Sequence, residues 1–156
     1  MKIGDFLLSK AITADLKGTT KEDVIEEMVK LLVNAGAVDK KHKSKLVEIL
    51  MAREALGSTA IGQGIAIPHG KCEYVSKLIA ALGVSKNGID FDSLDGEPAH
   101  IFFLLVAPAD SAGPHLKALS RISRLLKDKY FRDHLKNVKD EKMILELVSQ
   151  EDERVT

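Results

Sequence analysis

The sequence predicts an α/β protein in which one β-sheet is layered with helices. Two observations carry this prediction: short apolar runs lie in the middle of the chain, at 64–67, 77–84 and 101–106, and helical patterns precede and follow them. Continuous apolar runs are typical of strands covered on both faces, and the flanking helices can supply that cover. We expect one domain, 1–156, because no linker-like stretch divides the chain.

Two helices are predicted before the first of these strands. Residues 21–34 carry apolar side chains at helical spacing behind a segment that resembles a capping box, and Gly36 follows as a left-handed stop. Asp39 can cap a second helix, which Gly57 ends. Arg53 lies in the last turn of that helix, so we expect its guanidinium to reach the loop that follows.

The strand region holds a histidine at a defined place. The first apolar run, 64–67, is closed by Pro68, and a residue before proline favours an extended backbone. We therefore expect the chain to deliver His69 from the end of a strand. The pair Asn87-Gly88 predicts a turn between two strands.

Helices are predicted again after the last strand, which Pro108 ends. Gly113-Pro114 opens the first of them, and shorter helices follow near 128–136 and 140–149. The apolar stripe of the first helix recurs at steps of three and four: Leu116, Leu119, Ile122 and Leu126. Its basic side chains lie on another face and are expected to be solvated: Lys117, Arg121 and Arg124.

Composition excludes several classes of protein. The 156 residues include 23 Lys plus Arg and 23 Asp plus Glu, so no net charge draws the chain to nucleic acid or to an anionic membrane. The single cysteine, Cys72, excludes an internal disulfide and a cysteine-built zinc site. The histidines lack metal-ligand spacing, and we predict neither metal nor cofactor. The N-terminal segment 1–8 has too short an apolar run for a signal peptide, and Asp5 interrupts it, so we expect a cytoplasmic protein without membrane insertion.

The residues that remain for chemistry surround His69. Two phosphate-binding patterns fail nearby, because the segment from Gly62 lacks the third glycine of a dinucleotide fingerprint and Gln63 stands where a P-loop needs lysine. The Gly/Ser/Thr-rich loop 57–64 nevertheless supplies backbone donors and hydroxyls, and Gly70 leaves room after the histidine. A neutral imidazole can attack a phosphoryl group. These residues equally allow a turn histidine without chemistry.

A long motif resolves this choice by resemblance. The segment 53–71, which has the form RExxGST…GxGIAIPHGK, resembles the active-site segment of the fructose/mannitol-type enzyme IIA family of the phosphoenolpyruvate-dependent phosphotransferase system (PTS). The stretches 91–98, 108–110 and 115–120 are similar to the same family, so the resemblance covers nearly the whole chain. Its stand-alone nitrogen-regulatory subtype is the most similar. The resemblance implies a three-layer α/β sandwich with a mixed, mostly parallel central sheet and helices on both faces.

The resemblance also implies a site. His69 corresponds to the nucleophile that becomes a tele-phosphohistidine, with a phosphoryl group taken from the carrier protein HPr or its nitrogen-branch counterpart. The residues implied around that group are Arg53, Ser58, Thr59, Gly70 and His115. Arg53 would lie against the phosphoryl oxygens, and His115 would face His69 from the first turn of a helix, where free N–H groups favour an anion. By position alone, Arg53 can equally cap its helix and His115 can equally be a surface residue.

The implied activity is that of a phosphotransferase component that is incomplete without its partners. We expect a PTS phosphocarrier acting as a nitrogen-regulatory IIA protein. One alternative is a IIA subunit of a fructose/mannitol-type sugar transporter, which passes the phosphoryl group to a IIB cysteine. Another is a regulatory binding module, whose state at His69 switches contacts with transporters or sensor kinases. A homodimer is left open.

Overall fold

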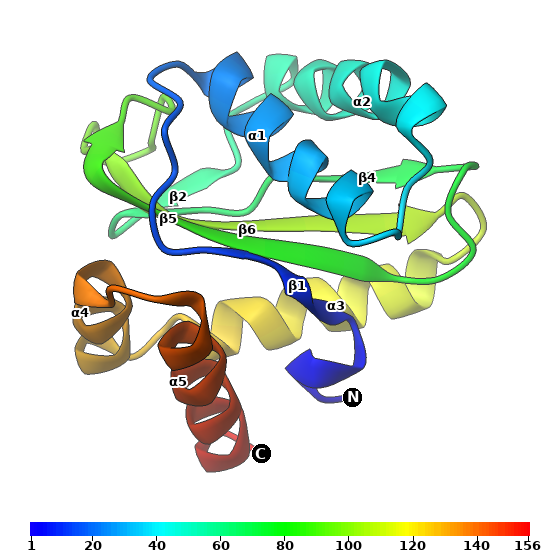
Figure 1. Ribbon diagram of the computed structural model, residues 1–156. Coiled ribbons are helices and arrows are strands. Elements are labelled where there is room, and N and C mark those ends of the chain that lie inside the picture. The colour runs from blue at the N-terminus through cyan, green and yellow to red at the C-terminus, as the bar shows by residue number, and fades with distance from the viewer.

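The computed structural model describes residues 1–156, which form three layers (Figure 1). Two helices cover one face of a central sheet: α1 (Lys21–Asn34) and α2 (Lys43–Ala55). Three helices cover the other face: α3 (Ala112–Leu125), α4 (Lys129–Asn137) and α5 (Glu141–Arg154). Short 3-10 turns precede the first strand and α2, at Ile3–Asp5 and Lys40–His42. The expected sandwich with helices on both faces is confirmed.

The central sheet has six strands in the order β1-β5-β6-β3-β2, and β4 also pairs with β6. Their bounds are β1 Leu7–Thr13, β2 Ala60–Gly62, β3 Ile65–Ala66, β4 His69–Cys72, β5 Ile79–Ile89 and β6 Ala99–Pro108. Strand β1 runs parallel to β5, and β3 and β4 run parallel to β6, whereas β5–β6 and β2–β3 are antiparallel. The sheet is therefore mixed and mostly parallel, as expected.

The core consists of two apolar clusters, one on each face of the sheet. Strand β6 contributes to both, because successive side chains point to opposite faces. Phe102, Leu104 and Val106 lie in the cluster under α1 and α2, whereas Ile101, Phe103 and Leu105 lie in the cluster under the other helices. All six are fully buried. The continuous apolar run thus reflects burial on both faces.

Local signals explain the bounds of α1. The Thr20 hydroxyl accepts a hydrogen bond from the Asp23 N–H (3.1 Å), and Gly36 follows the helix with φ +79°. The helix packs closely against β5 at Gly83, where a Cβ atom would lie 2.7 Å from Leu16 Cδ1 and 2.8 Å from Met28 Sδ. Gly83 therefore allows this helix to lie directly on the sheet.

The structure adds to or corrects the strand predictions at three points. Strand β1 was not predicted, and the structure places it at the edge of the sheet. His69 follows the short strand β3, as expected, but it also begins a further strand, β4, because Pro68 separates β3 from β4 and both pair with β6. Asn87 and Gly88 lie within β5 rather than between strands, in the stretch where pairing with β6 shifts register and Gly88 has φ +79°.

The predicted apolar stripe of α3 is confirmed at Ile122 and Leu126, which are buried, and Leu119 is partly buried, but the prediction is wrong at Leu116. The buried face of α3 consists of His115, Ala118, Ile122 and Leu125, whereas Leu116 is 68% exposed. Contrary to the expectation of a solvated side chain, Arg121 is bound within the protein. Its Nε donates to Asp152 Oδ1 (2.7 Å), and its Nη2 donates to the Asp152 carbonyl (2.8 Å). Helix α5 also extends to Arg154, beyond the predicted end at 149.

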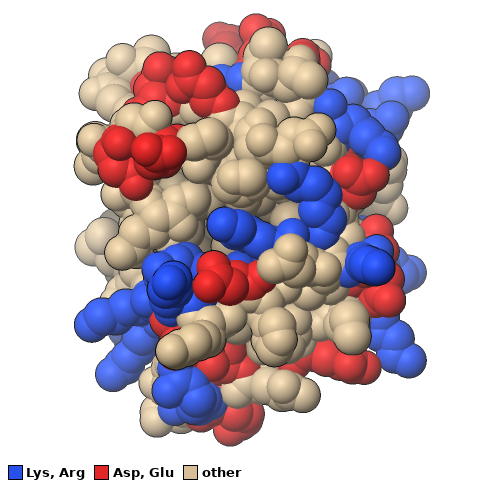
Figure 2. Space-filling model, turned by 90° about the vertical axis from the view of Figure 1, so that its left-hand side faces the viewer, with Lys and Arg blue, Asp and Glu red and all other residues tan.

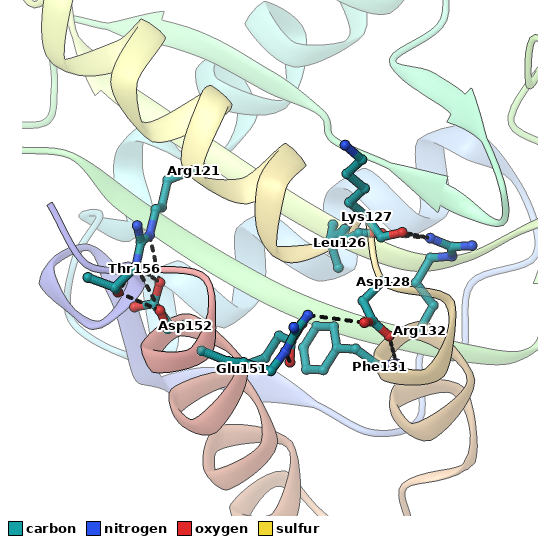
Figure 3. Close-up of polar contacts among 10 residues, drawn as sticks. Arg121, Leu126, Lys127, Asp128, Phe131, Arg132, Glu151, Asp152 and Thr156 are labelled. Carbon is teal, nitrogen blue, oxygen red and sulfur yellow. Dashed lines mark hydrogen bonds and ion pairs between the residues drawn. The ribbon is translucent and has the colours of Figure 1, made fainter.

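Polar contacts fix the three helices of this layer to one another (Figure 3). The Arg132 guanidinium, nearly buried, donates to the carbonyls of Leu126 and Lys127 just after α3 (2.9 and 2.7 Å). Asp152 accepts the Arg121 bond and also the Ile3 N–H (2.7 Å), which ties α5 to the beginning of the chain. None of the helices is both long enough and apolar enough to span a membrane.

Candidate active site

His69 begins β4, where it pairs with Leu105 of β6, and its side chain is half-buried. Its Nδ1 lies 2.7 Å from the carbonyl oxygen of Ile67, two residues earlier. A carbonyl oxygen only accepts hydrogen bonds, so Nδ1 carries the proton. The lone pair of the neutral ring is then on Nε2, which makes no hydrogen bond within the protein.

Gly70 determines how β4 meets α2. A Cβ atom at Gly70 would lie 3.2 Å from Ile49 Cγ2 and 3.6 Å from Leu50 Cδ2, so this side of the strand faces α2. Neighbouring residues of a strand point to opposite sides. His69 and Lys71 therefore point toward the α3 side, and the missing side chain of Gly70 makes room for α2.

His115 reaches the same place from α3. Its ring centroid lies 5.5 Å from that of His69, with the ring planes at 71°. The side chain is buried, and its Nε2 has no hydrogen-bond partner. Burial lowers the pKa of His115 below its ordinary value, and the nearby His69 and Lys71 lower it further. We therefore treat the His115 ring as neutral at neutral pH.

The backbone at the start of α3 differs in detail from the expectation. The His115 N–H is not free, because it donates to the carbonyl of Ser111 (3.0 Å). The unpaired N–H groups of this first turn belong to Ala112 and Gly113, since Pro114 has none. An anion at this helix end would therefore be bound by the first two residues of the helix.

Arg53 lies in the last turn of α2, as expected, and its Nη1 donates to the carbonyl of Gly57 (2.9 Å). This contact caps the helix end and holds the first residue of the glycine-rich loop. No hydrogen bond joins Arg53 to His69. The other N–H groups of the guanidinium make no hydrogen bond within the protein.

The two hydroxyl groups of the loop are already engaged. Ser58 Oγ donates to the carbonyl of Phe91 (2.5 Å) and accepts from the Ala60 N–H (3.0 Å). Thr59 is buried; its hydroxyl donates to the Glu54 carboxylate, and its N–H donates to Glu54 Oε1 (3.2 Å). Neither hydroxyl is free to turn toward His69 while these bonds persist.

Sequence reasoning missed two charged residues behind the loop. Glu54 follows Arg53 directly but points inward, and Lys21 at the start of α1 lies 3.4 Å from Glu54 Oε1. The adjacent Arg53-Glu54 pair could have been a signal, but nothing local indicates that Lys21 would lie beside Glu54. No group of three His, Cys, Asp or Glu side chains lies close enough to hold a metal ion.

Charge on the surface is mixed. Figure 2 shows the end of the molecule near β2 and α4, where Lys and Arg side chains occur in small groups between Asp and Glu. Neither sign covers this face, in keeping with the zero net charge of the chain.

Fold and site together define an α/β sandwich that presents a histidine at the start of a strand, beside a second histidine on the facing helix. Residues 5–151 match the family model "Phosphoenolpyruvate-dependent sugar phosphotransferase system, EIIA 2". The chain belongs to this family of PTS IIA domains. The match includes every residue of the site described above.

Individual relatives are of two kinds. The chain is 36% identical, over 96% of its length and 95% of the other, to the "Nitrogen regulatory protein" of Bradyrhizobium diazoefficiens. It is 40% identical, over 97% of its length, to the "PTS system fructose-specific EIIABC component" of Bacillus subtilis, but spans only 24% of that protein. The crystal structure of nitrogen regulatory protein IIA-Ntr from Neisseria meningitidis superposes with a TM-score of 0.84 at 32% identity, covering 94% of this chain and 98% of that one.

Proposed function

We propose that the protein is a PTS phosphocarrier that takes a phosphoryl group onto Nε2 of His69 and acts as a nitrogen-regulatory IIA protein. The donor is HPr or its nitrogen-branch counterpart, which carries the group on a histidine. The contact between His69 Nδ1 and the Ile67 carbonyl is the observation that carries this proposal. It leaves the lone pair on Nε2, which is the atom that the tele product requires.

The transfer exchanges one phosphorus–nitrogen bond for another. The Nε2 lone pair attacks phosphorus, and the bond from phosphorus to the donor nitrogen breaks. The ring of His69 gains positive charge as the new bond forms, and the Ile67 carbonyl stabilises that charge at the Nδ1 proton. No metal is needed in this step, because the transferred group comes from a phosphohistidine rather than a nucleotide.

The surrounding groups stabilise the negative charge of the phosphoryl oxygens. Arg53 can supply guanidinium N–H groups that are unused in the present state, and His115 has an unpartnered Nε2. The free N–H groups at the start of α3 add two more donors. The Ser58 and Thr59 hydroxyls are engaged with Phe91 and Glu54. We therefore propose that Ser58, Thr59 and Gly70 help to bind the phosphoryl group through the position of their backbone rather than through their side chains.

The direct test is phosphorylation by purified components. Phosphoenolpyruvate, enzyme I and the carrier protein should add one acid-labile phosphate, and ¹H–¹⁵N correlation spectra should place it on Nε2 of His69. His69→Ala should take up none. An acid-stable phosphate, or labelling that survives the substitution, contradicts the proposal.

The sugar-transport role is the second candidate, since the fructose-specific relative has 40% identity. In that case the protein passes its phosphoryl group to a cysteine of a IIB protein. Adding IIB and IIC proteins with fructose or mannitol separates the two roles, because sugar phosphorylation selects transport. In the regulatory role, phosphorylation of His69 instead changes binding to transporters or sensor kinases.

Three further proposals accompany the function. Residues 1–156 fold as one domain, because helices from both ends of the chain pack on the same sheet. The protein acts in the cytoplasm, where its proposed donor is found. The third proposal is that the protein can associate as a homodimer, which sedimentation measurements test.

A further inference from the structure

We infer that Glu54, together with Lys21, is a positioning residue of the phosphoryl site, which orients His69 through a chain of hydrogen bonds. The inference rests on the proposed function of His69. It concerns residues that touch neither the histidine nor the transferred group, so their effect must pass through the loop 57–64.

The Glu54 carboxylate is buried and fully used. Its side chain is 2% exposed, and it accepts both the hydroxyl and the N–H of Thr59. Lys21 Nζ lies 3.4 Å from Glu54 Oε1 and 3.0 Å from Asp92 Oδ2, and 4.8 Å above the ring of Phe91. A buried carboxylate is tolerated when charge and hydrogen bonds compensate it, and this one has both.

A continuous path leads from this carboxylate to the nucleophile. Glu54 holds the backbone of Thr59, and the Thr59 carbonyl in turn accepts the Ile67 N–H (3.2 Å). The carbonyl of the same residue, Ile67, accepts the Nδ1 proton of His69. The group that sets the orientation and tautomer of His69 is therefore anchored, two hydrogen bonds back, on Glu54.

The same anchor has a second consequence for Arg53. Arg53 and Glu54 are adjacent in the last turn of α2, and they hold the loop at different points, Gly57 and Thr59. If Arg53 turns to the phosphoryl oxygens, it releases the Gly57 carbonyl. The Glu54 contacts, and the bond from Ser58 to Phe91, then keep the loop in place.

A purely structural ion pair is the competing explanation, and the molecule contains a matched control. Arg121 and Asp152 form an ion pair of similar burial, 12% and 6% exposed, between α3 and α5 (Figure 3). This pair lies in the C-terminal helical layer and makes no contact with the loop 57–64. Weakening it should lower stability without disturbing the path to His69.

The experiment compares four variants of the whole protein. Glu54→Gln removes the buried charge that anchors the path, Thr59→Val removes the hydroxyl bond to Glu54 but keeps the backbone N–H bond, Thr59→Ser keeps both bonds, and Asp152→Asn weakens the control pair. Each is measured for kcat and KM of phosphoryl transfer from the phosphorylated carrier, for Tm, and for the ¹⁵N shifts of the His69 ring. The ring shifts report the tautomer and do not depend on the transfer reaction.

We expect Glu54→Gln to lower kcat about tenfold or more with little change in KM, since small misplacements of a reacting group have effects of this size. Thr59→Val should lower kcat less, because the N–H bond from residue 59 to Glu54 persists. Their His69 spectra should show a mixture of tautomers. Thr59→Ser, which keeps the hydroxyl group, should lower kcat less than Thr59→Val does. Asp152→Asn should lower Tm but keep the kcat of the folded protein and the Nδ1–H tautomer.

Two results overturn the inference: Glu54→Gln with the original kcat and tautomer, or Asp152→Asn slowing transfer as much as Glu54→Gln does. If Glu54→Gln does not fold, the hydroxyl part of the anchor is still tested, because the original kcat and tautomer in Thr59→Val also overturn the inference. Failure of the proposed function is distinct, because the unsubstituted protein would then take up no phosphate on His69. The ring shifts would still show whether Glu54 orients that histidine.

Discussion

The contact between β4 and α2 at Gly70 allows a graded test of how the site is held together. Gly70→Ala places a Cβ atom 3.2 Å from Ile49 Cγ2, whereas ordinary carbon contacts are about 3.5–4.0 Å. The neighbour must therefore move by about 0.3 to 0.8 Å. Gly70→Val adds two methyl groups in the same direction, so it must push α2 away from β4.

The expected costs follow from these distances. Overpacking of a core contact costs about 1–3 kcal/mol, and we expect a cost in this range for Gly70→Val. Gly70→Ala should stay within about 1 kcal/mol of the original protein, because alanine lowers the conformational entropy of the unfolded chain and this partly offsets the close contact. For a chain of this size each kcal/mol lowers Tm by about 3 °C. Moving α2 also moves Arg53 relative to His69, so Gly70→Val should slow phosphoryl transfer more than Gly70→Ala.

Urea unfolding and initial rates of transfer, measured on the same preparations, check this prediction. The reasoning is refuted if Gly70→Val is as stable as the original protein. It is also refuted if Gly70→Ala loses transfer at unaltered stability, because the added methyl group would then face the phosphoryl site rather than α2.

Three other expectations concern single residues. Because the pKa of His115 is lowered from about 6.5, the unfolded chain takes up its proton first, so stability should fall as the pH drops through 6.5 toward the folded pKa; His115→Gln should lose this part of the pH dependence in urea titrations. Arg53→Ala should slow transfer about 100-fold while changing stability by less than about 1 kcal/mol, and loss of the fold would favour a purely structural role. Phe102→Ala should cost about 3–5 kcal/mol of unfolding free energy, and a cost under about 1 kcal/mol would contradict the two-faced burial of β6.

Local signals account for the parts of the fold that could be predicted. Helix α1 begins at a capping threonine and ends before a left-handed glycine, so both its bounds follow from neighbours in the sequence. Strand β6 is recognisable because burial on both faces makes it apolar throughout. Strand β1 escaped prediction because it lies at an edge and alternates irregularly between buried and exposed positions, with Ser9 and Lys10 exposed in its middle.

Helix α3 shows where local patterns are insufficient. Its leucines recur at steps of three and four, and this spacing indicates a helix without determining which neighbouring stripe faces the sheet. The packing of α3 on β6 buries His115 and leaves Leu116 exposed. The rotation of α3 that exposes Leu116 also places the second histidine beside His69.

By itself, the sequence determined the α/β class and the motif that carries Arg53, the glycine-rich loop and His69, because these depend on contiguous residues. Only the tertiary structure decided that His115 lies 5.5 Å from the His69 ring and that Lys21 neutralises Glu54 behind the loop. These partners come from different helices, and their proximity depends on how two helical layers pack on one sheet. Packing of this kind depends on the summed burial of many side chains, so no single segment of the chain encodes it.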